Sequence, residues 1–421
     1  MQRRMLTRLL FILSIILSSQ LPSAAADTAE VISAAFYPYR AGLPQQSGIL
    51  PGVVIDQHHW QITEPVLPAE LLRLVQAGDF TISIQETTDL PVRPAYIAAT
   101  AERFQSVMLD GDNRVEHYQG GRPFPQLDTA DPRAGEKAAW NFRYRDVPQT
   151  LEMRNTMQGV NNAGVIDRQN IGRARTRYGM HRSGEEENDT QWSERGVYMK
   201  TSFQLMYPAD QEGRMRIFTL YDDDHLSREE LNYNPQNRRI RKAHANFLER
   251  MGGGRYDVLM EEQPPFFFIG YIHEYQWTYK GEQILLVPGF LKAEQVSYGG
   301  KHNWYPSVPW ELRRVVVLEA TPKGAHPYGK RRFYFDAQTY VLLSFLSFDT
   351  TGAVVRLALM VHGHPDSVPG ARNVGLPVPL GATWINFTQE RAAQFVAGDA
   401  ACNRADSPRR YELMELLRKG K

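Results

Sequence analysis

Residues 312–361 read LRRVVVLEATPKGAHPYGKRRFYFDAQTYVLLSFLSFDTTGAVVRLALMV, and this stretch decides the fold. It contains four runs rich in β-branched and aromatic residues, the composition that strands prefer. The runs cover residues 312–320, 331–336, 340–349 and 354–361. Because short turns join antiparallel neighbours, the sequence predicts a β-meander here.

Strand patterns also extend upstream of this stretch, to about residue 196. Tyr275, Trp277 and Tyr279 alternate with polar residues, and Lys280-Gly281 predicts a turn into a further strand. Aromatic residues make up 11% of the 421-residue chain, which favours strands. We therefore expect one mainly β domain with some helices (α+β), over residues 61–385.

Helical patterns flank these strands. Three helices are expected before residue 145: over residues 67–75, from Pro94, and from Pro132 through Trp140. Residues 27–60 are rich in Pro, Gly and Gln without a clear period, so an extended arm is expected there. Residues 386–421 are expected to form a helical tail with two patterns, one after Thr388 and one around Leu413, Leu416 and Leu417.

The first 26 residues have the pattern of a secretory signal peptide. Arg3, Arg4 and Arg8 precede a short apolar run, and Ala24-Ala25-Ala26 forms a small-residue cleavage site. The run is too short for a membrane span, which is the alternative interpretation. No Cys lies near the site, so lipidation is not expected. We expect cleavage after Ala26 and a periplasmic mature chain, because a long secreted eukaryotic chain would more often carry disulfides.

Composition and motifs exclude several function classes. Lys and Arg number 48 against 47 Asp and Glu, so no excess of positive charge indicates nucleic-acid binding. The single Cys402 excludes a disulfide framework and a Cys-rich zinc site. Zinc-protease, nucleophile-elbow and phosphate-loop motifs are absent from the sequence. We predict no catalytic residues, metal or cofactor, and no enzyme activity.

A basic cluster follows the turn at residues 234–237. It consists of Arg238, Arg239, Arg241 and Lys242. Such cations guard a solvated strand edge against pairing, or they bind an anionic headgroup or an acidic partner. The sequence leaves both interpretations open.

An aromatic run, Phe266, Phe267 and Phe268, precedes the strand at residue 275. Three consecutive rings cannot share one sheet face, so the run is either core buried on both sides or the lining of an apolar cavity. In the second case the hydrophobic ligand-binding candidates also include Tyr271, Trp277 and Tyr279.

Several blocks in order resemble the proteobacterial domain-of-unknown-function family 1329, often labelled outer-membrane lipoprotein-sorting-like. They are residues 121–125, 131–145, 238–241, 310–313, 319–323, 326–331 and 334–336, and the resemblance runs from about residue 60 to 365. It implies a fold similar to the Lol-type lipoprotein carriers. In that fold a curved antiparallel half-barrel sheet has helices covering its concave apolar face.

The resemblance also implies a role in the cell envelope. It points to a periplasmic carrier for a lipid, lipoprotein or other hydrophobic molecule, working with an inner-membrane transporter of the resistance-nodulation-division type and an outer-membrane protein. The alternatives are a non-catalytic adaptor of a transport complex and, with no motif to support it, a periplasmic hydrolase. No membrane span is expected in the mature chain.

Overall fold

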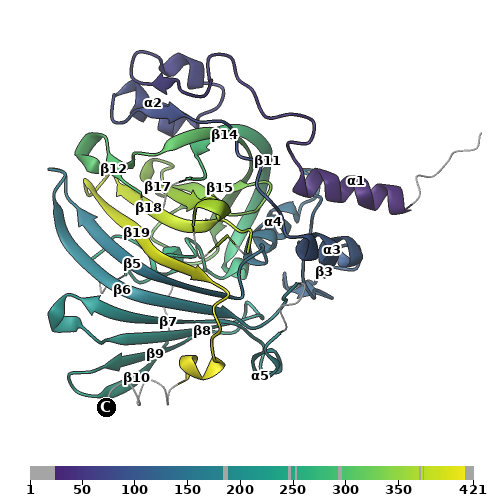
Figure 1. Ribbon diagram of the computed structural model, residues 1–421, viewed down its shortest axis with the longest axis vertical. Helices are drawn as coiled ribbons and strands as arrows, with labels where there is room; N and C mark the ends of the chain where they lie inside the picture. The colour runs from purple at the N-terminus through teal and green to yellow at the C-terminus, as the bar shows by residue number, and fades with distance from the viewer. Residues whose placement is uncertain are drawn as a thin grey trace, which may run out of the picture.

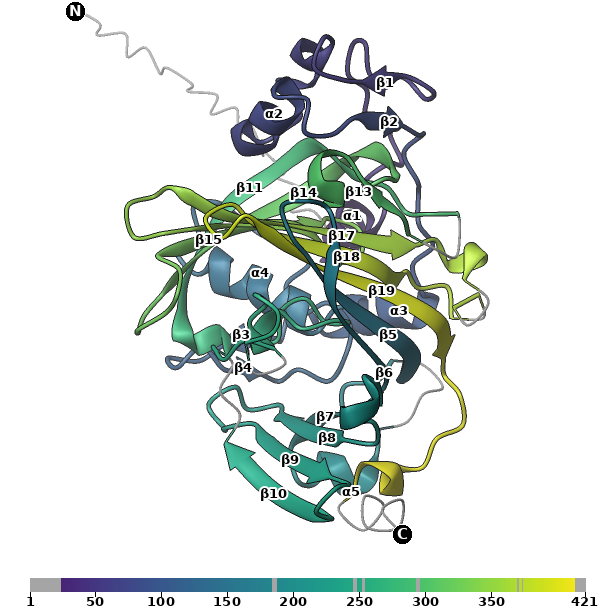
Figure 2. The same cartoon turned by 90° about the vertical axis from the view of Figure 1, so that its left-hand side faces the viewer.

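The computed structural model describes residues 24–183, 188–244, 248–251, 254–292, 296–368, 371–372 and 374–412. One sheet of fifteen strands dominates it and curves around a concave face without closing into a barrel (Figures 1 and 2). The strand order is β1-β2-β14-β15-β16-β17-β18-β19-β5-β6-β7-β8-β9-β10, with β11 also paired to β14. The predicted fold class is confirmed.

The strands of the sheet are antiparallel except for the contact between β2 and β14. They are β1 (Val54–Ile55), β2 (Ile82–Ile84), β5 (Thr150–Val160), β6 (Ile166–Tyr178), β7 (Val197–Tyr207), β8 (Met215–Tyr221), β9 (Glu229–Asn234), β10 (Arg239–His244), β11 (Tyr275–Pro288), β14 (Pro309–Pro322), β15 (Lys330–Asp336), β16 (Leu342–Phe348), β17 (Val354–Gly363), β18 (Val378–Asn386) and β19 (Arg391–Cys402). Two short pairs lie apart: β3 (Met108–Leu109) with β4 (Val115–Glu116), and β12 (Tyr298–Gly299) with β13 (Tyr305–Pro306).

The helices are short. The α-helices are α1 (Ala24–Phe36), α2 (Ala69–Gln76), α3 (Pro94–Arg103), α4 (Ala134–Arg143) and α5 (Thr190–Ser193). The 3₁₀ turns are η1 (Trp60–Thr63), η2 (Ala209–Gln211), η3 (Met260–Glu262), η4 (Ile272–Glu274), η5 (Lys301–Asn303), η6 (Pro365–Ser367) and η7 (Pro408–Tyr411). No helix in the described ranges is both long and apolar enough to cross a bilayer.

The chain builds the sheet in two halves. The open half is β5 to β10, and the filled half is β11 together with β14 to β19 (Figure 2). The last strand, β19, pairs with β5 along nearly its whole length, so the halves are continuous. The meander predicted from residues 312–361 is β14 to β17 and is confirmed.

Both faces of the filled half are buried. Alternate residues such as Phe333 and Met360 face a concave core, and Tyr334 and Leu359 face a second core on the convex side. Helix α4 contributes to the concave core, while α2 with β1 and β2 covers the convex side (Figures 1 and 2). A strand buried on both faces reads as a continuous apolar run, as β16 does.

A second segment, residues 254–274, lies in the concave core beside α4, and we call it the plug. It connects the two halves in the sequence and contains η3 and η4. On the convex side of the open half, Arg173 and Arg175 form ion pairs with Glu152 at 2.9 Å. The sheet is therefore sandwiched in one half and amphipathic in the other.

Several predicted elements are wrong in detail. Residues 386–402 form the end of β18 and β19, because this alanine-rich segment completes the sheet between β18 and β5. The predicted extended arm at residues 27–60 begins as α1, whose Phe36 packs against Tyr96 of α3 at 5.9 Å. Lys280-Gly281 is a bulge inside the continuous strand β11, with Gly281 at φ +89°, rather than a turn.

Some of the other predictions concern residues that the structure does not describe, and the rest are largely confirmed. Residues 1–23, which carry most of the predicted signal peptide, and the leucines near residue 413 lie outside the described residues. Helices α2 and α3 and the turn after β9 are confirmed. Helix α4 begins at Ala134 rather than Pro132, because Asp131 Oδ1 accepts from the Arg133 amide at 2.8 Å in a turn before the helix.

Candidate functional site: a pocket on the open half

The aromatic run belongs to the concave core. Phe266, Phe267 and Phe268 are all buried, and none of them lines the large cavity described below. The Phe267 ring lies 6.1 Å from that of Trp384, and the Phe268 ring lies 5.2 Å from that of Phe333. Of the two interpretations, the geometry favours core.

The other aromatic candidates also lie away from the cavity. Trp277 is buried and its indole nitrogen donates to the Ile272 carbonyl at 2.9 Å. Tyr271 and Tyr279 are half-buried against the same concave core. The Tyr271 hydroxyl accepts from the Arg228 amide at 2.7 Å. The six aromatic residues predicted to bind a ligand therefore hold the plug and α4 in place.

Buried ion pairs fix the plug to the filled half. Arg331 on β15 contacts Glu261 at 2.6 Å and Glu262 at 3.4 Å, and Arg356 on β17 contacts Glu262 at 2.9 Å and also Asp257. Burial raises the pKa of each carboxyl, but Arg331 keeps the pKa of Glu261 below its usual range. Arg356 does the same for Asp257, whereas burial leaves the pKa of Glu262 raised. These charges compensate one another, so they position the plug.

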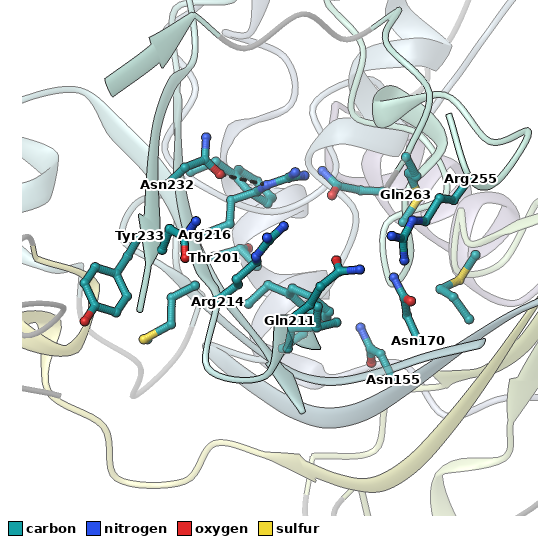
Figure 3. Close-up of a pocket in the computed structure, with 18 of the residues that line it drawn as sticks. Asn155, Asn170, Thr201, Gln211, Arg214, Arg216, Asn232, Tyr233, Arg255 and Gln263 are labelled. Atoms are coloured by element: carbon teal, nitrogen blue, oxygen red, sulfur yellow. Dashed lines mark hydrogen bonds between the residues drawn. The ribbon is translucent and has the colours of Figure 1, made fainter. Parts of the chain in front are cut away.

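A cavity of about 540 Å³ lies between the plug and the concave face of the open half (Figure 3). This volume is within the roughly 300–1,000 Å³ of small-molecule sites. The residues that line it are Asn155, Met157, Asn170, Ala174, Thr201, Phe203, Leu205, Gln211, Arg214, Met215, Arg216, Phe218, Asn232, Tyr233, Asn234, Asn237, Arg239, Arg241, Met251, Arg255, Tyr256, Gln263 and Pro264.

Strand register places lining residues in one row across the sheet. Ala174 on β6 pairs with Phe203 on β7, and Phe203 pairs with Arg216 on β8. Arg216 pairs with Asn232 on β9, which pairs with Arg241 on β10. The row is apolar on β6 and β7 and becomes polar and cationic from β8 to β10. The pocket therefore has an apolar floor and a cationic side.

The apolar floor depends on a glycine. At Gly172 on β6, an added Cβ would lie 2.3 Å from Cζ of Phe203. The absence of a side chain lets the Phe203 ring lie across β6, where it shapes the floor of the cavity. Beyond it, the Phe218 ring packs edge to face on Phe266 of the plug at 6.1 Å. The plug thus contacts the sheet at Phe218, beside the apolar floor.

Five arginines line the cavity, four on its cationic side and Arg255 on the plug, and none of the described residues that line the cavity is Asp or Glu. Arg216 has an acidic neighbour, with Nε 3.2 Å from Glu230 Oε1. Within the described residues, the Arg214 guanidinium donates a side-chain hydrogen bond to the neutral Gln236 at 3.5 Å and forms no ion pair. Arg239 and Arg241 are exposed, and no ion pair involves either of them within the described part of the chain.

The basic cluster predicted from the sequence is split by strand alternation. Arg239 and Arg241 occupy alternate positions of β10 and line the cavity. Lys242 does not line it and pairs with Glu229 at 2.9 Å, and Arg238 sits in the turn at φ +49°. Of the four residues predicted to bind a headgroup or partner, only Arg239 and Arg241 therefore line the cavity.

The plug supplies the opposite wall of the cavity. Arg255 and Gln263 reach into it from the plug, facing Asn155, Asn170 and Arg214 of the sheet (Figure 3). Burial raises the pKa of nearby Tyr256 to about 12, so its hydroxyl stays neutral and donates to the Met157 carbonyl at 3.1 Å.

Two buried polar atoms of the lining are unpaired. Within the described residues, Asn155 Oδ1 and Gln263 Nε2 have no hydrogen-bond partner, although both side chains are more than nine-tenths buried. Buried polar groups in folded proteins are almost always hydrogen-bonded. Both residues line the cavity, so these two atoms are candidate partners for a polar ligand group.

Two side chains with reactive chemistry, Cys402 and His362, are kept neutral by burial. Burial raises the pKa of the Cys402 thiol to about 12, and burial next to Arg145 lowers the pKa of His362 to about 3. Within the described residues, no three His, Cys, Asp or Glu side chains gather as a metal site would require. The pocket offers guanidinium and amide donors and apolar surface, which is the chemistry of binding.

Most residues of the pocket were not predicted from the sequence. Strands β5 and β6, which carry Asn155 and Asn170, show no clear pattern in the sequence, and Arg255 belongs to no recognisable motif. One signal was available: Arg214 and Arg216 show the same two-residue spacing as Arg239 and Arg241. Arginines repeated at this spacing at two places in one sheet, here on either side of β9, indicate a cationic sheet face.

The chain is similar to a protein family and to several solved structures. The sequence model of the family described as "Protein of unknown function (DUF1329)" matches residues 54–407. A DUF1329 family protein from Desulfovibrio piger is 14% identical with a TM-score of 0.47, and the match covers 68% of this chain and 100% of that one. A Vibrio parahaemolyticus domain named for outer membrane lipoprotein sorting is 13% identical with the same TM-score and coverage.

A more distant similarity is to a LolA superfamily protein from Nitrosomonas europaea. It is 9% identical with a TM-score of 0.36, over 65% of this chain and 94% of that one. No curated protein matches the chain.

Proposed function

The chain belongs to DUF1329, a family of proteins of unknown function, and from that premise we propose that it is a periplasmic carrier for a hydrophobic or amphipathic molecule. The pocket of the open half is the proposed binding site. The apolar part of the ligand lies on the floor formed by Met157, Ala174, Phe203 and Leu205, beneath the plug.

The observation that carries this proposal is the contrast in what covers the concave face. In the filled half the plug and α4 occupy it, whereas in the open half a cavity of about 540 Å³ remains over apolar side chains. Burying one CH₂ group there contributes about 0.8 kcal/mol. A ligand with an alkyl chain therefore binds without a dedicated hydrogen bond for each part.

The cellular setting is part of the same proposal. The export pattern of residues 1–26 supports delivery to the periplasm with cleavage after Ala26 and without lipidation. There the carrier would exchange its ligand with an inner-membrane transporter of the resistance-nodulation-division type and an outer-membrane protein. A non-catalytic adaptor role remains the second proposal, because the ion pairs on the convex side of β5 and β6 also offer a polar docking face.

Native mass spectrometry of the protein purified from its host tests the carrier proposal. We expect an added mass that organic solvent removes and that lipid analysis identifies as a molecule with an alkyl or polyprenyl chain. Uptake of a fluorescent fatty-acid analogue by delipidated protein provides the second measurement. A ligand-free protein that also takes up no apolar probe would contradict the carrier and favour the adaptor.

A matched pair of variants on β7 locates the site. Phe203→Ala removes part of the floor, whereas Met206→Ala changes an exposed side chain three residues along the same strand. We expect probe affinity to fall for Phe203→Ala and to stay unchanged for Met206→Ala. Equal affinity in both variants would place the probe elsewhere.

A further inference from the structure

We infer that the pocket selects amphiphiles whose head group carries a phosphate monoester or another group with two or more negative charges. This inference deepens the proposed function and rests on it, because it assigns the head of a molecule whose tail occupies the apolar floor. The head would lie between β8 and β10 on one side and the plug on the other.

The first argument is charge balance. Arg214, Arg239, Arg241 and Arg255 line the cavity without an acidic partner among the described residues. By contrast, the fully buried Arg313, Arg331 and Arg356 of the filled half each contact two carboxylates. Four uncompensated guanidinium groups around one cavity are satisfied by a dianion better than by a single carboxylate.

The second argument is geometry. A guanidinium presents a planar fork of donors that matches phosphate oxygens in a bidentate way. Arg214 and Arg255 approach the cavity from opposite walls, one from the sheet and one from the plug (Figure 3). Gln263 adds a buried amide nitrogen with no partner among the described residues, and that nitrogen donates to an anion. Hydrogen-bond donors on two opposite walls can surround a tetrahedral phosphate, and not only a planar carboxylate.

The third argument excludes a purely protective role for the cations. Edge strands often carry cations that deter pairing with another chain, and β10 is an edge strand. However, Arg214 directly precedes β8, which is not an edge strand, and Arg255 lies on the plug. Neither can guard the edge, and yet both line the same cavity as Arg239 and Arg241. A shared ligand explains all four positions.

The arrangement also places head and tail. In the row that runs from Ala174 and Phe203 to Arg216 and Arg241, polarity increases in one direction across the sheet. An amphiphile follows this gradient with its tail over β6 and β7 and its head near β10. Arg239 and Arg241 are exposed, so the head enters last and stays close to solvent.

The test uses the delipidated full-length mature protein and probes with one twelve-carbon chain. Dodecyl phosphate, dodecanoate and dodecyl maltoside are titrated by calorimetry below their micelle concentrations. We expect dodecyl phosphate to bind at least about tenfold more tightly than dodecanoate, a difference of about 1.4 kcal/mol. Its affinity should fall with added salt, because screening weakens the contacts to exposed arginines.

Two double variants separate the pocket arginines from their neighbours in the chain. Arg239→Gln with Arg241→Gln should weaken dodecyl phosphate at least about tenfold and leave dodecyl maltoside unchanged. Arg238→Gln with Lys242→Gln removes the same charge from residues outside the cavity and should change neither affinity. Circular dichroism checks that both variants fold.

The outcomes distinguish the inference from the proposed function. Equal binding of the three amphiphiles would overturn the charge selection and leave the carrier standing. Binding of inorganic phosphate or pyrophosphate as tight as that of dodecyl phosphate would identify a site for free phosphate, and the carrier proposal would fail. Loss of dodecyl phosphate binding in the Arg238 and Lys242 control would place the anion outside the pocket and overturn the inference.

Discussion

The arginines of the two halves of the sheet have opposite surroundings. In the filled half, Arg331, Arg356 and Arg313 are fully buried, and each meets two carboxylates. In the open half, four of the five arginines around the pocket meet none within the described residues. Arginines paired with carboxylates therefore fix the architecture, whereas arginines without a carboxylate partner mark the surface available to a ligand.

The difference follows from what each half must bury. Arg313 on β14 contacts Glu311 at 2.6 Å and Asp336 at 2.7 Å, and it fixes the start of the meander. A buried ion pair is costly to desolvate and adds little net stability, but its removal on one side is strongly destabilising. Such pairs therefore determine where the plug lies. Among the described residues, no ion pair joins the plug to the sheet residues that line the cavity, and the cavity stays open.

The largest expected effect comes from breaking the plug's ion pairs. Arg331→Met leaves Glu261 and Glu262 buried without that cation, so we expect a loss of about 3–5 kcal/mol in the free energy of unfolding. Urea denaturation at pH 7 measures it. The variant should regain part of the loss at lower pH, where the carboxyls become protonated.

The matched control removes an arginine from the open half. Arg239→Met should change the free energy of unfolding by less than about 0.5 kcal/mol, because the side chain is exposed and unpaired within the described residues. Similar losses in both variants would show that the two halves do not differ as described.

Two phenylalanine variants test the comparison on apolar residues. Phe267→Ala empties a core position and should cost about 3–5 kcal/mol without changing the affinity for an apolar probe. Phe203→Ala, at a half-buried position on the pocket floor, should cost less stability and should weaken the probe. Loss of probe binding in Phe267→Ala at normal stability would restore the cavity-lining interpretation of the aromatic run.

The sequence predicted the filled half well for a physical reason. Its strands are buried on both faces, so they read as continuous runs of Val, Leu and Phe that no helix period interrupts. The family was also predicted correctly, and the blocks at residues 310–313, 326–331 and 334–336 contain the buried Glu311, Arg313, Arg331 and Asp336. Motifs that fix the architecture are the ones a sequence comparison finds.

The open half was harder to predict. On β6, Arg173 and Arg175 face the convex side while Ala174 faces the pocket, so neither face gives an apolar stripe. The helix expected after Thr388 is β19, whose alanines favour helix locally, but pairing with β18 and β5 overrides that preference. The pocket itself unites residues from β5 to β10 and the plug, and only the curvature of the sheet brings them together.

The stability of the filled half at acid pH depends on His362. Burial next to Arg145 lowers the pKa of this histidine of β17 to about 3, so the folded protein keeps it neutral while the unfolded chain protonates near pH 6.5. Its contribution is present above pH 6.5 and is lost as the pH falls toward 3, by up to about 1.4 kcal/mol per pH unit. His362→Gln should flatten the decline in unfolding free energy between pH 6 and 4, measured in urea. An unchanged slope would show that His362 does not stay neutral.

The smallest expected effect lies where the open half contacts the plug. Asp224, in the connection after β8, contacts Arg143 of α4 at 3.2 Å and His273 of the plug at 3.1 Å. The hydrogen bond to Asp224 raises the pKa of His273 against the opposing effect of burial, and Glu274 adds to the rise while Lys323 opposes it.

A raised folded-state pKa means that protonated His273 stabilises the fold at pH values below its ordinary 6.5, and that this stabilisation is lost as the pH rises through the raised value. His273→Gln should therefore be less stable than the unmodified protein at pH 5.5, and the difference should shrink at pH 8.5. The neighbouring His225 provides the control, because its ring stacks on His273 at 4.1 Å without an ion pair to Asp224 among the described contacts. If His225→Gln shows the same pH dependence, the effect comes from the stacked rings and not from the contact that joins the plug to the open half.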